Sequence, residues 1–382
     1  MIILCLSGNN RNSIYALLGI LETYGHYIGN DVCLIKLYSK NLELEKLKNE
    51  KNFFLFSFST KDAQAAYNEL HKLKKIYNKS VFICGGPHPA GAPKDCLNAG
   101  FDMVVRGESE NIMQKILNPE FKKQKIHKSD KPADLDLYPP FSLKDPHYSL
   151  YVEITRGCPH NCYFCQTTKI FGAKPRHRSI ENVVKYCEIL LKNKLGDLRF
   201  VSPNAFSYGS VTGLDINYQA LNGLLKSLYN LTKGKGRLFF GSFPSEVRPE
   251  FVNDDTISLI KKYCCNKNVM IGAQSGSERI LKKINRKHSV ENVFNAVKIS
   301  IKYGLLPNID VISGFPFETE NDVKDTIKFC ENLIEYGCKI HFHKFFPIPG
   351  TQFERIQPSG LHPEFKNFLN KWRGKGIIYG NF

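Results

Sequence analysis

Three cysteines stand close together in the stretch EITRGCPHNCYFC, residues 153–165, directly after a short apolar run. Cys158, Cys162 and Cys165 have the spacing C-x3-C-x2-C. Three thiolates on one compact loop can hold three irons of a [4Fe–4S] cluster, which leaves the fourth iron without a protein ligand. The competing interpretation is a zinc site with His160 as the fourth ligand. Structural zinc sites usually draw their ligands from two separated pairs, and a second C-x-x-C is missing, so the spacing favours a cluster with one open iron.

Cysteine content and charge restrict the class of protein. The 12 cysteines of this 382-residue chain are scattered through an ordinary globular composition, which favours metal or redox chemistry over a disulfide framework. The start, MIILCLSGNN, turns polar by residue 8, and no apolar run approaches the roughly 18 residues of a membrane helix. We therefore expect a cytoplasmic protein without a membrane span. The formal net charge of +17 favours acidic partners, although a Lys-rich proteome explains it equally well.

The first part of the chain alternates strand-like and helix-like segments. Residues 62–77 are compatible with a helix, and the apolar runs that predict strands lie at 2–7, 53–59, 80–86 and 101–108. Continuous apolar strands between helices are typical of a parallel sheet covered on both faces, so we expect a doubly wound, Rossmann-like α/β domain over residues 1–115. Ligands of such sheets lie beyond the carboxyl ends of the strands.

The rest of the chain predicts a linker, a second domain and a tail. Residues 116–150 are rich in Lys, Asp and Pro without periodicity, as in a linker. Six β-plus-α repeats over residues 151–350 predict a partial (β/α)6 barrel of the TIM type, with a site at the carboxyl ends of its strands. Its expected strands lie at 151–155, 198–202, 237–243, 268–273, 307–313 and 339–346. Residues 351–382 predict a short helical tail that packs on the barrel.

The segment RGCPHNCYFC resembles the cluster-binding motif of the radical SAM enzymes, C-x3-C-x-aromatic-C, with Phe164 at the aromatic position. In that family the open iron is chelated by the amino and carboxylate groups of S-adenosylmethionine (SAM), and reductive cleavage gives a 5′-deoxyadenosyl radical. The resemblance implies a [4Fe–4S] cluster and SAM as cofactors, and an external electron donor such as ferredoxin or flavodoxin. The implied cluster ligands are Cys158, Cys162 and Cys165.

Later segments resemble the strand ends of the same barrels. Residues 271–289 resemble the fourth-strand segment, which usually has Glu where Gln274 stands, and residues 310–322 and 342–351 resemble the fifth-strand turn and the sixth-strand closure. Residues 199–210 depart from the acidic pair often seen in related enzymes. The resemblance implies SAM contacts by Phe164, Ser202, Asn204, Ser242, Gln274, Ser275, Arg286, Asp310 and Gly314.

Other polar residues near the expected strand ends have weaker interpretations. Glu246 and Arg248 follow the third expected strand of the second domain and are as easily a surface pair as part of a site. The groups that we consider for the substrate side are Tyr208, Tyr379, His341 and His343.

The segment VFICGGPHPAGAPKDCLNAGFDMVVRGESE, residues 81–110, resembles the GGPHP segment and the GE-containing loop of the cobalamin-binding domains fused to one branch of the radical SAM superfamily. Two glycines after a buried strand let the backbone approach a flat macrocycle closely. The sequence lacks the D-x-H-x-x-G motif, so no protein imidazole is assured as a lower cobalt ligand. The resemblance implies cobalamin contacts by Ser57, Ser59, Thr60, Gly85, Gly86, Pro87, His88, Gly107 and Glu108.

Taken together, the chain is identified as a member of the cobalamin-binding radical SAM family, as a class B methyltransferase of archaeal type. This implies transfer of a methyl group from methylcobalamin to an unactivated carbon after hydrogen abstraction by the 5′-deoxyadenosyl radical. The substrate stays open between a protein or peptide, an acidic metabolite, a lipid and RNA.

Three alternatives remain. One is a methylthiotransferase acting on tRNA or protein, for which a second cluster could use cysteines among Cys5, Cys33, Cys84 and Cys96, although the tail is short for an RNA-binding barrel. A second is cobalamin-dependent cyclisation or oxidation. The third is a cobalamin or iron sensor without turnover, which the complete set of three cluster cysteines disfavours.

Overall fold

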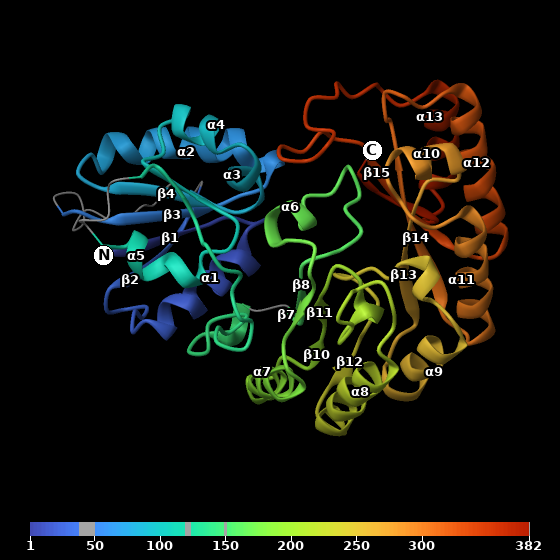
Figure 1. Cartoon of the computed structure of the whole chain (residues 1–382), viewed down its shortest axis with the longest axis horizontal. Helices are drawn as coiled ribbons and strands as arrows, with labels where there is room; N and C mark the ends of the chain where they lie inside the picture. Colours follow the sequence, from blue (N-terminus) through green and yellow to red (C-terminus); the bar gives the residue numbers. More distant parts are fainter. Residues whose placement is uncertain (38–49, 119–123, 149–150, 382) are drawn as a thin grey trace. The chain divides into compact units, whose positions relative to one another are not determined.

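The computed structural model describes residues 1–37, 50–118, 124–148 and 151–381. Contacts divide the chain into two compact units, each an α/β structure (Figure 1). Unit 1 contains Met1–Leu150, Lys169–Phe171 and Ile348–Thr351, and unit 2 contains Tyr151–Thr168, Gly172–Pro347 and Gln352–Phe382.

Unit 1 is built on a parallel sheet with the strand order β2-β1-β3-β4-β5-β6. The strands are β1 (Ile2–Leu6), β2 (Val32–Lys36), β3 (Phe53–Ser57), β4 (Val81–Gly85), β5 (Met103–Arg106) and β6 (Ile126–Lys128). The four strands that the apolar runs predict are confirmed, whereas β2 and β6 were not predicted. The order reverses between β1 and β3, and such a switch point is where doubly wound sheets bind ligands at their carboxyl edge.

Helices cover both faces of this sheet. They are α1 (Arg11–Thr23), α2 (Ala63–Ile76), α3 (Pro87–Gly91), α4 (Pro93–Asn98) and α5 (Met113–Ile116), with 3-10 turns at Thr60–Asp62, Glu110–Ile112 and Pro146–Tyr148. Alternate residues of a strand point to opposite faces. Accordingly, Ile3 of β1 packs in one buried cluster with Leu70 of α2, and Leu4 packs in another with Leu18 of α1. The doubly wound arrangement is therefore confirmed.

The segment 116–150, predicted as a linker, is part of unit 1 in its described residues. Its strand β6 pairs in parallel with β5. Leu135 and Phe141 are buried, and Glu22 of α1 accepts hydrogen bonds from the hydroxyl of Ser142 and, at 2.8 Å, from the backbone N–H of Leu143. A three-residue edge strand and a loop held by one carboxylate produce no periodic apolar pattern. For this reason the sequence predicted a linker where the structure has a part of unit 1.

Unit 2 has short strand pairs followed by a longer parallel sheet. The first strands are β7 (Val152–Glu153), β8 (Thr155–Arg156), β9 (Arg176–His177), β10 (Asp197–Leu198), β11 (Phe200–Val201) and β12 (Arg237–Leu238). Strands β7 and β11 pair in parallel, as do β10 and β12, and β8 and β9 form an antiparallel pair. The longer sheet has the order β13 (Asn268–Gln274), β14 (Leu306–Ser313), β15 (Lys339–Lys344) and β16 (Ile378–Asn381).

Helices alternate with these strands along the chain, as in a partial (β/α) barrel, although Lys169–Phe171 of the first helix belong to unit 1. They are α6 (Thr167–Phe171), α7 (Ile180–Lys192), α8 (Tyr218–Thr232), α9 (Asp254–Tyr263), α10 (Glu278–Lys283), α11 (Val290–Lys302), α12 (Glu320–Glu335) and α13 (Pro363–Arg373), with 3-10 turns at Ala205–Ser207 and Pro249–Phe251. Each of the six expected strand segments contains strand residues. The tail adds more than a helix, because β16 pairs in parallel with β15 and extends the sheet.

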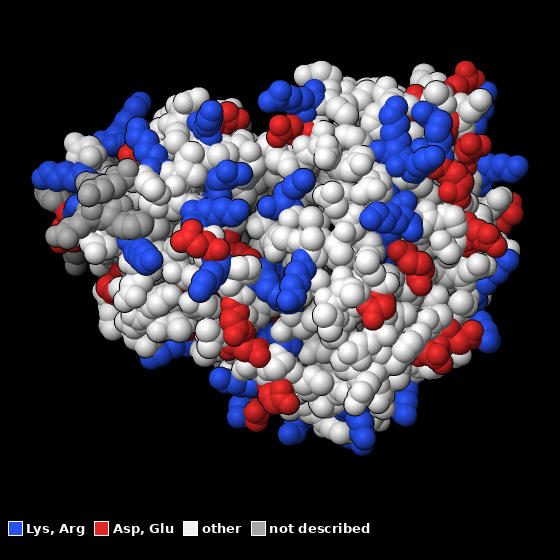
Figure 2. All heavy atoms as spheres, viewed as in Figure 1, with Lys and Arg blue, Asp and Glu red and all other residues white. Residues whose placement is uncertain are grey.

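No helix among the described residues is long and apolar enough to cross a membrane. Figure 2 shows Lys and Arg side chains spread over the face in view, with Asp and Glu between them, rather than gathered into one patch. The net charge of +17 therefore marks no single docking area on that face.

Candidate functional site

The cysteine loop is held in place by backbone contacts at its beginning. Gly157 adopts a φ of +92°, and a Cβ there would lie 2.4 Å from the carbonyl oxygen of Lys174, so the position requires glycine. The N–H of Cys158 donates to the oxygen of Gly172 at 3.1 Å, and the hydroxyl of Thr168 donates to the oxygen of Cys158 at 2.7 Å. These bonds fix the first cysteine of the loop.

Two buried guanidinium groups lie beside the second cysteine. Nη1 of Arg286 is 3.7 Å and Nη1 of Arg248 is 3.9 Å from Cys162 Sγ, and both arginines are buried. Burial raises the pKa of Cys158 to about 11 and also raises the pKa of Cys165. Nearby cations favour the anionic thiolate, which is the metal-binding form of cysteine. The loop can therefore hold iron once the metal and the guanidiniums balance the buried negative charge.

The donor set that lies closest together in the described residues is not the cysteine loop. Among the residues that the structure describes, the one set of three His, Cys, Asp or Glu donor atoms that all lie within 4.8 Å of one another belongs to Asp310, His341 and His343. The three cysteines do not form such a set among the described residues. The preference for a cluster over zinc therefore rests on the spacing C-x3-C-x2-C and on the missing second C-x-x-C.

His160, the fourth ligand in the zinc interpretation, is buried inside the loop. Neither of its ring nitrogens has a hydrogen-bond partner, and its ring lies edge-on to Phe251 at 6.3 Å. Burial lowers the pKa of His160 to about 3, so the ring is neutral. Asn285 Nδ2 donates to the backbone oxygen of His160 at 3.2 Å, which ties this part of the loop to the end of α10.

Buried polar atoms without partners occur on the two arginines that contact Cys162 and on two residues that follow strands β11 and β12. They are Nδ2 of Asn204, Oγ of Ser242, Nη2 of Arg248 and Nε of Arg286. Asn204 Oδ1 accepts a hydrogen bond from the N–H of Arg248 at 3.2 Å, which links it to the arginine beside Cys162. Leaving a buried polar group unpaired costs about 1–3 kcal/mol. These atoms therefore fit a polar ligand such as the amino acid end of SAM, and three of their four residues were predicted as SAM contacts.

Two other predicted SAM contacts have protein partners for their hydroxyl groups. Ser202 Oγ donates to the backbone oxygen of Asn204 at 3.0 Å. Ser275 Oγ lies 3.2 Å from the hydroxyl of Thr326 on α12 and accepts from the N–H of Ser277 at 3.1 Å. The described geometry gives these serines a structural part, and their contact with SAM stays a prediction.

Phe164 and Gly314 are held by different means. Phe164 packs against the buried cluster that contains Phe315. Gly314 adopts a φ of +94°, and its N–H donates to Glu318 Oε2 at 2.7 Å. Burial raises the pKa of Glu318 to about 7, although the hydrogen bond from Gly314 works against this shift. Both positions shape the ends of the strands, and their SAM contacts stay predictions.

Gln274 ends β13 with a left-handed backbone, a φ of +76°, at an irregularity in its pairing with β14. Its Nε2 donates to Glu246 Oε2 at 3.4 Å, and Nη2 of Arg286 lies 3.9 Å from Glu246 Oε1. Arg286 also donates to the backbone oxygen of Gly272 at 2.5 Å. Burial raises the pKa of Glu246 to about 7. An amide, a carboxyl and a guanidinium therefore meet at the end of β13.

The interpretation of Glu246 and Arg248 as a surface ion pair is wrong. Arg248 is buried, and its Nε donates to Glu250 Oε1 at 2.6 Å. Sequence reasoning missed that this arginine faces Cys162, because the two residues are far apart in the chain and only the fold brings them together. Tyr208 is likewise buried, and its hydroxyl donates to the backbone oxygen of Arg178 at 2.7 Å, so it is a core residue.

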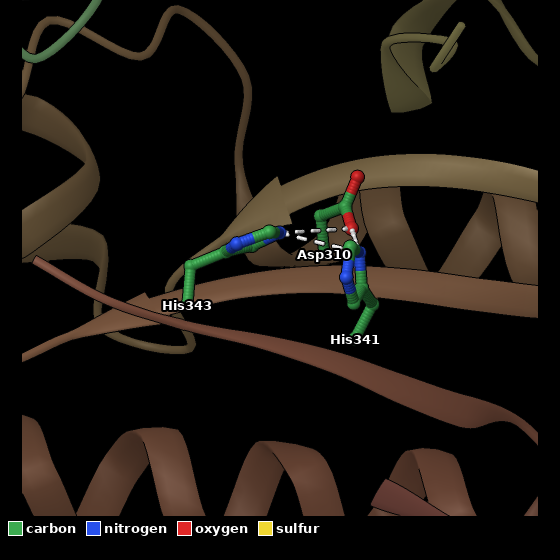
Figure 3. A group of neighbouring side chains, drawn as sticks. All are labelled: Asp310, His341 and His343. Atoms are coloured by element: carbon green, nitrogen blue, oxygen red, sulfur yellow. Dashed lines mark hydrogen bonds and ion pairs between the residues drawn. The ribbon is translucent and has the colours of Figure 1, made fainter. Parts of the chain in front are cut away.

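The remaining predicted groups form a polar row on β14, β15 and β16, and Figure 3 shows three of them, Asp310, His341 and His343. Strand pairing sets Asp310 beside His341, and His341 beside Tyr379. Asp310 Oδ1 lies 2.6 Å from His341 Nδ1 and 3.6 Å from His343 Nε2. The rings of His341 and Tyr379 stack with centroids 4.7 Å apart. The carboxylate of Asp310 is thus engaged with histidines, and its predicted contact with SAM stays a prediction.

In unit 1, the GGPHP segment follows β4 at the carboxyl edge of the sheet. Gly86 adopts a φ of +97°, and a Cβ there would lie 2.8 Å from Ser57 Oγ, so the chain requires glycine at this turn. Pro87 begins α3. The glycines therefore let the ends of β3, β4 and β5 pack closely, and the approach of a flat ligand to Gly85 and Gly86 stays a prediction.

His88 points into unit 1. Its Nε2 lies 2.9 Å from the hydroxyl of Tyr67, and its Nδ1 lies 3.3 Å from the hydroxyl of Thr60. The ring is buried, and burial lowers its pKa. Because both ring nitrogens have partners, the described geometry offers no free imidazole of His88 to a cobalt ion.

The other predicted cobalamin residues lie in loops after β3 and β5. Ser59 Oγ donates to Asp62 Oδ2 at 2.7 Å. Gly107 has a φ of +79°, and Glu108 accepts a hydrogen bond from the N–H of Ala133 at 3.0 Å. These contacts order the loops, and the corrin contacts themselves stay predictions.

A loop that sequence reasoning missed lies at the same edge. Residues 7–10 follow β1, and Asn10 Nδ2 donates to the backbone oxygens of Cys5 and Ser57, each at 2.9 Å. Asn10 thereby joins the ends of β1 and β3, the two strands of the switch point. The polar run SGNN directly after a buried strand was the signal that could have identified it.

The chain thus combines a doubly wound, Rossmann-like domain with a partial (β/α) barrel that carries a three-thiol loop. This combination defines the class of the protein: an α/β protein with a loop suited to an iron–sulfur cluster. The family model of the radical SAM superfamily matches residues 152–330. This part of the chain belongs to that superfamily, and a [4Fe–4S] cluster and SAM are the cofactors of such a domain.

Comparison with solved structures extends the likeness to the fold of most of the chain. The radical SAM methyltransferase TsrM from Kitasatospora setae, solved with cobalamin and a [4Fe–4S] cluster bound, superposes with a TM-score of 0.67 at 14% identity. The match covers 92% of this chain and 74% of that chain. At this identity the likeness shows that the two share a fold.

Curated relatives give two further likenesses. The chain is 28% identical over 312 residues to "Uncharacterized methyltransferase PH0819" of Pyrococcus horikoshii, covering 74% of this chain and 64% of that one. It is 34% identical over 237 residues to tRNA-2-methylthio-N(6)-dimethylallyladenosine synthase of Clostridium perfringens, covering 60% of this chain and 50% of that one. The chain thus spans less than two thirds of the length of these relatives.

Proposed function

We propose that the chain is a cobalamin-dependent radical SAM methyltransferase that methylates an unactivated carbon. One observation carries the proposal: the same chain contains a radical SAM domain and a doubly wound sheet. The carboxyl edge of that sheet carries a Gly-Gly turn after β4. Methyl transfer of this kind needs both a radical source and a methyl carrier, and each unit supplies the surroundings for one of them.

In unit 2, Cys158, Cys162 and Cys165 would hold the cluster, which supplies the electron for reductive cleavage of SAM. Arg286 and Arg248 would offer their unpaired N–H groups to the cofactor carboxylate, because charge-assisted hydrogen bonds from a guanidinium are the strongest available to that group. Asn204 Nδ2 and Ser242 Oγ would provide further polar contacts. Burial of these side chains keeps water away from the reactive carbon.

In unit 1, the turns that follow β3, β4 and β5 would hold cobalamin, which supplies the methyl group. Gly85 and Gly86 would lie against the corrin, and the loops with Ser57, Ser59, Thr60, Gly107 and Glu108 would line the site. Because His88 is engaged by Tyr67 and Thr60, it would support the turn from behind rather than bind cobalt. The likeness in fold to TsrM, solved with cobalamin bound, supports this assignment.

The substrate class, the electron donor and the site of action in the cell complete the proposal. A protein or peptide, an acidic metabolite, a lipid and RNA all suit the positive net charge of +17. A ferredoxin or flavodoxin would deliver electrons, and the cytoplasm would provide the reducing conditions that free thiols need.

Anaerobic reconstitution tests the proposed function. The purified chain is incubated with iron, sulfide and hydroxocobalamin, desalted, reduced, and supplied with SAM, and the SAM products are measured by mass spectrometry. Formation of both 5′-deoxyadenosine and S-adenosylhomocysteine, with corrin retained by the protein, supports methyl transfer. A preparation that retains no corrin, or that makes 5′-deoxyadenosine alone, contradicts it.

A methylthiotransferase is the second candidate, and the 34% identity to the Clostridium perfringens synthase favours it. Such an enzyme needs a second cluster in unit 1. Cys5, Cys84 and Cys96 are instead buried in the apolar cluster between β-strands and α2, with Cys33 packed at its edge. Burial raises the pKa of Cys5 and of Cys84, which disfavours the thiolate.

Iron content separates the two candidates. A methylthiotransferase with two clusters binds about eight irons per chain, and the proposed methyltransferase about four. Iron analysis after reconstitution, together with corrin absorbance, therefore decides between them.

A further inference from the structure

The polar row in the longer sheet of unit 2 contains three metal-type donor atoms that converge on one point. Asp310 lies on β14, and His341 and His343 lie on the neighbouring β15. Residues two apart on a strand share a face, and strand pairing sets Asp310 directly beside His341. The donor atoms of all three side chains lie within 4.8 Å of one another, and Figure 3 shows the two rings turned toward the carboxylate.

The distances between these atoms suit a bound ion. His341 Nδ1 is 2.6 Å from Asp310 Oδ1 and 3.2 Å from His343 Nε2, and His343 Nε2 is 3.6 Å from the same oxygen. Ligands that bind one ion at about 2.1 Å, at angles between 90° and 120°, lie about 3.0–3.6 Å apart. Two of the three distances fall in that interval, and the third requires a shift of only a few tenths of an ångström.

Hydrogen bonding engages His343 only through longer contacts. Asp310 Oδ1 lies 2.6 Å from His341 Nδ1, whereas His343 Nε2 lies 3.2 Å from that nitrogen and 3.6 Å from the oxygen. Glu246 is a second carboxyl group that interacts with Asp310. A divalent cation would accept electron pairs from both nitrogens and the oxygen at once, and would offset the negative charge.

The surroundings leave room for further ligands. The side chains of Asp310, His341 and His343 are 10%, 22% and 37% exposed, so the group is partly open on the side of His343. The ring of Tyr379 stacks on His341 and fixes its plane. His341 and His343 lie outside residues 152–330, the range of the radical SAM family match, whereas Asp310 lies inside it.

We propose that Asp310, His341 and His343 form a second metal site, which binds one divalent first-row transition ion such as Mn²⁺ or Zn²⁺. Two imidazoles and one carboxylate on one side of an ion leave open positions, which water or an oxygen of an anionic substrate takes. Asp310 is also a predicted SAM contact, but none of the three ligands is a cluster cysteine, so ion binding can be measured in a chain without the cluster.

Titration of the cluster- and hydroxocobalamin-loaded chain with Mn²⁺, followed by electron paramagnetic resonance (EPR), tests this site. The oxidised cluster and Co(III) contribute no signal, and the hard Mn²⁺ ion avoids thiolates. The expected result is one Mn²⁺ per chain, displaced by Zn²⁺. The affinity should fall at least tenfold in Asp310→Asn and in His343→Ala. His71→Ala, a change at an exposed histidine of unit 1, should bind Mn²⁺ like the wild type.

Failure of the metal-site proposal can be told apart from failure of the proposed methyltransferase function. Cys162→Ala should bind Mn²⁺ like the wild type even though its cluster is lost, so a defect in SAM chemistry leaves this result unchanged. Circular dichroism checks the fold of each variant, and His343 is exposed enough for its replacement to be tolerated. Wild-type protein that binds less than one Mn²⁺, or variants of Asp310 and His343 that bind as tightly as the wild type, overturns the proposal.

Discussion

Replacement of Arg248 by Met removes a buried positive charge from beside the cysteine loop and keeps an apolar side chain of similar length. Arg248 Nη1 lies 3.9 Å from Cys162 Sγ. If the added electron is taken to lie about 6 Å from this charge, at an effective dielectric constant of about 20, the lost attraction is about 3 kcal/mol.

That energy sets the expected shift in potential. A factor of ten, or about 1.4 kcal/mol, corresponds to 59 mV for a one-electron couple. Arg248→Met should therefore lower the midpoint potential of the cluster by about 120 mV. The assay is a redox titration of the reconstituted protein, followed by the EPR signal of the reduced cluster.

Two further variants control the sign and the position of the effect. Glu250 pairs with Arg248, so Glu250→Gln removes a negative charge and should raise the potential. Arg237 pairs with Asp197 at an exposed position, so Arg237→Met should leave the potential unchanged. An unchanged or raised potential in Arg248→Met, with iron content preserved, would refute the electrostatic reasoning.

Three other variants have definite expectations. Asp322 accepts hydrogen bonds from two hydroxyls, a backbone N–H and a guanidinium, and these lower its pKa although burial opposes the shift. These bonds stabilise the folded state fully at pH values above the pKa of Asp322 in the unfolded chain, about 4. The stabilisation is lost as the pH falls through the lower pKa of Asp322 in the folded chain. Asp322→Asn should thus lower the free energy of unfolding by about 2–4 kcal/mol at pH 7, with a smaller difference at pH 3 in urea denaturation; an equal loss at both values would argue against it. Gly86→Ala places a Cβ 2.8 Å from Ser57 Oγ at a φ of +97° and should weaken corrin binding. The control Gly100→Ala is strained at a φ of +105° but lacks that contact, so it should lower the stability and leave corrin binding unchanged. Cys162→Ala should abolish 5′-deoxyadenosine formation and keep corrin binding; loss of corrin in a folded variant contradicts the assignment of cobalamin to unit 1.

Apolar patterning predicted the central strands of both units, because a buried parallel strand reads as a continuous apolar run. It missed β6, which has three residues and contains buried His127. It also missed β16, whose residues IYGN have no strand pattern and pair only because α13 returns the chain to β15. Short edge strands depend on neighbours that the local sequence does not reveal.

The candidate site divides in the same way. The spacing of the three cysteines is a local property, so the sequence alone identified the loop. The role of Arg248 depends on a contact across 86 positions, and its neighbours Glu246 and Glu250 both offered plausible ion pairs. The pair His341 and His343 shares a strand face by alternation, but its convergence on Asp310 depends on the register between β14 and β15.

The central claim is that three thiols hold a cluster whose fourth iron is open to SAM. Electron–nuclear double resonance of the reduced cluster measures this directly, with SAM carrying ¹⁷O in its carboxylate and ¹⁵N in its amino group. We predict hyperfine coupling of both nuclei to the cluster in the wild-type chain. A cluster that shows neither coupling in the presence of saturating SAM, or zinc in place of iron at the three cysteines, would contradict the claim.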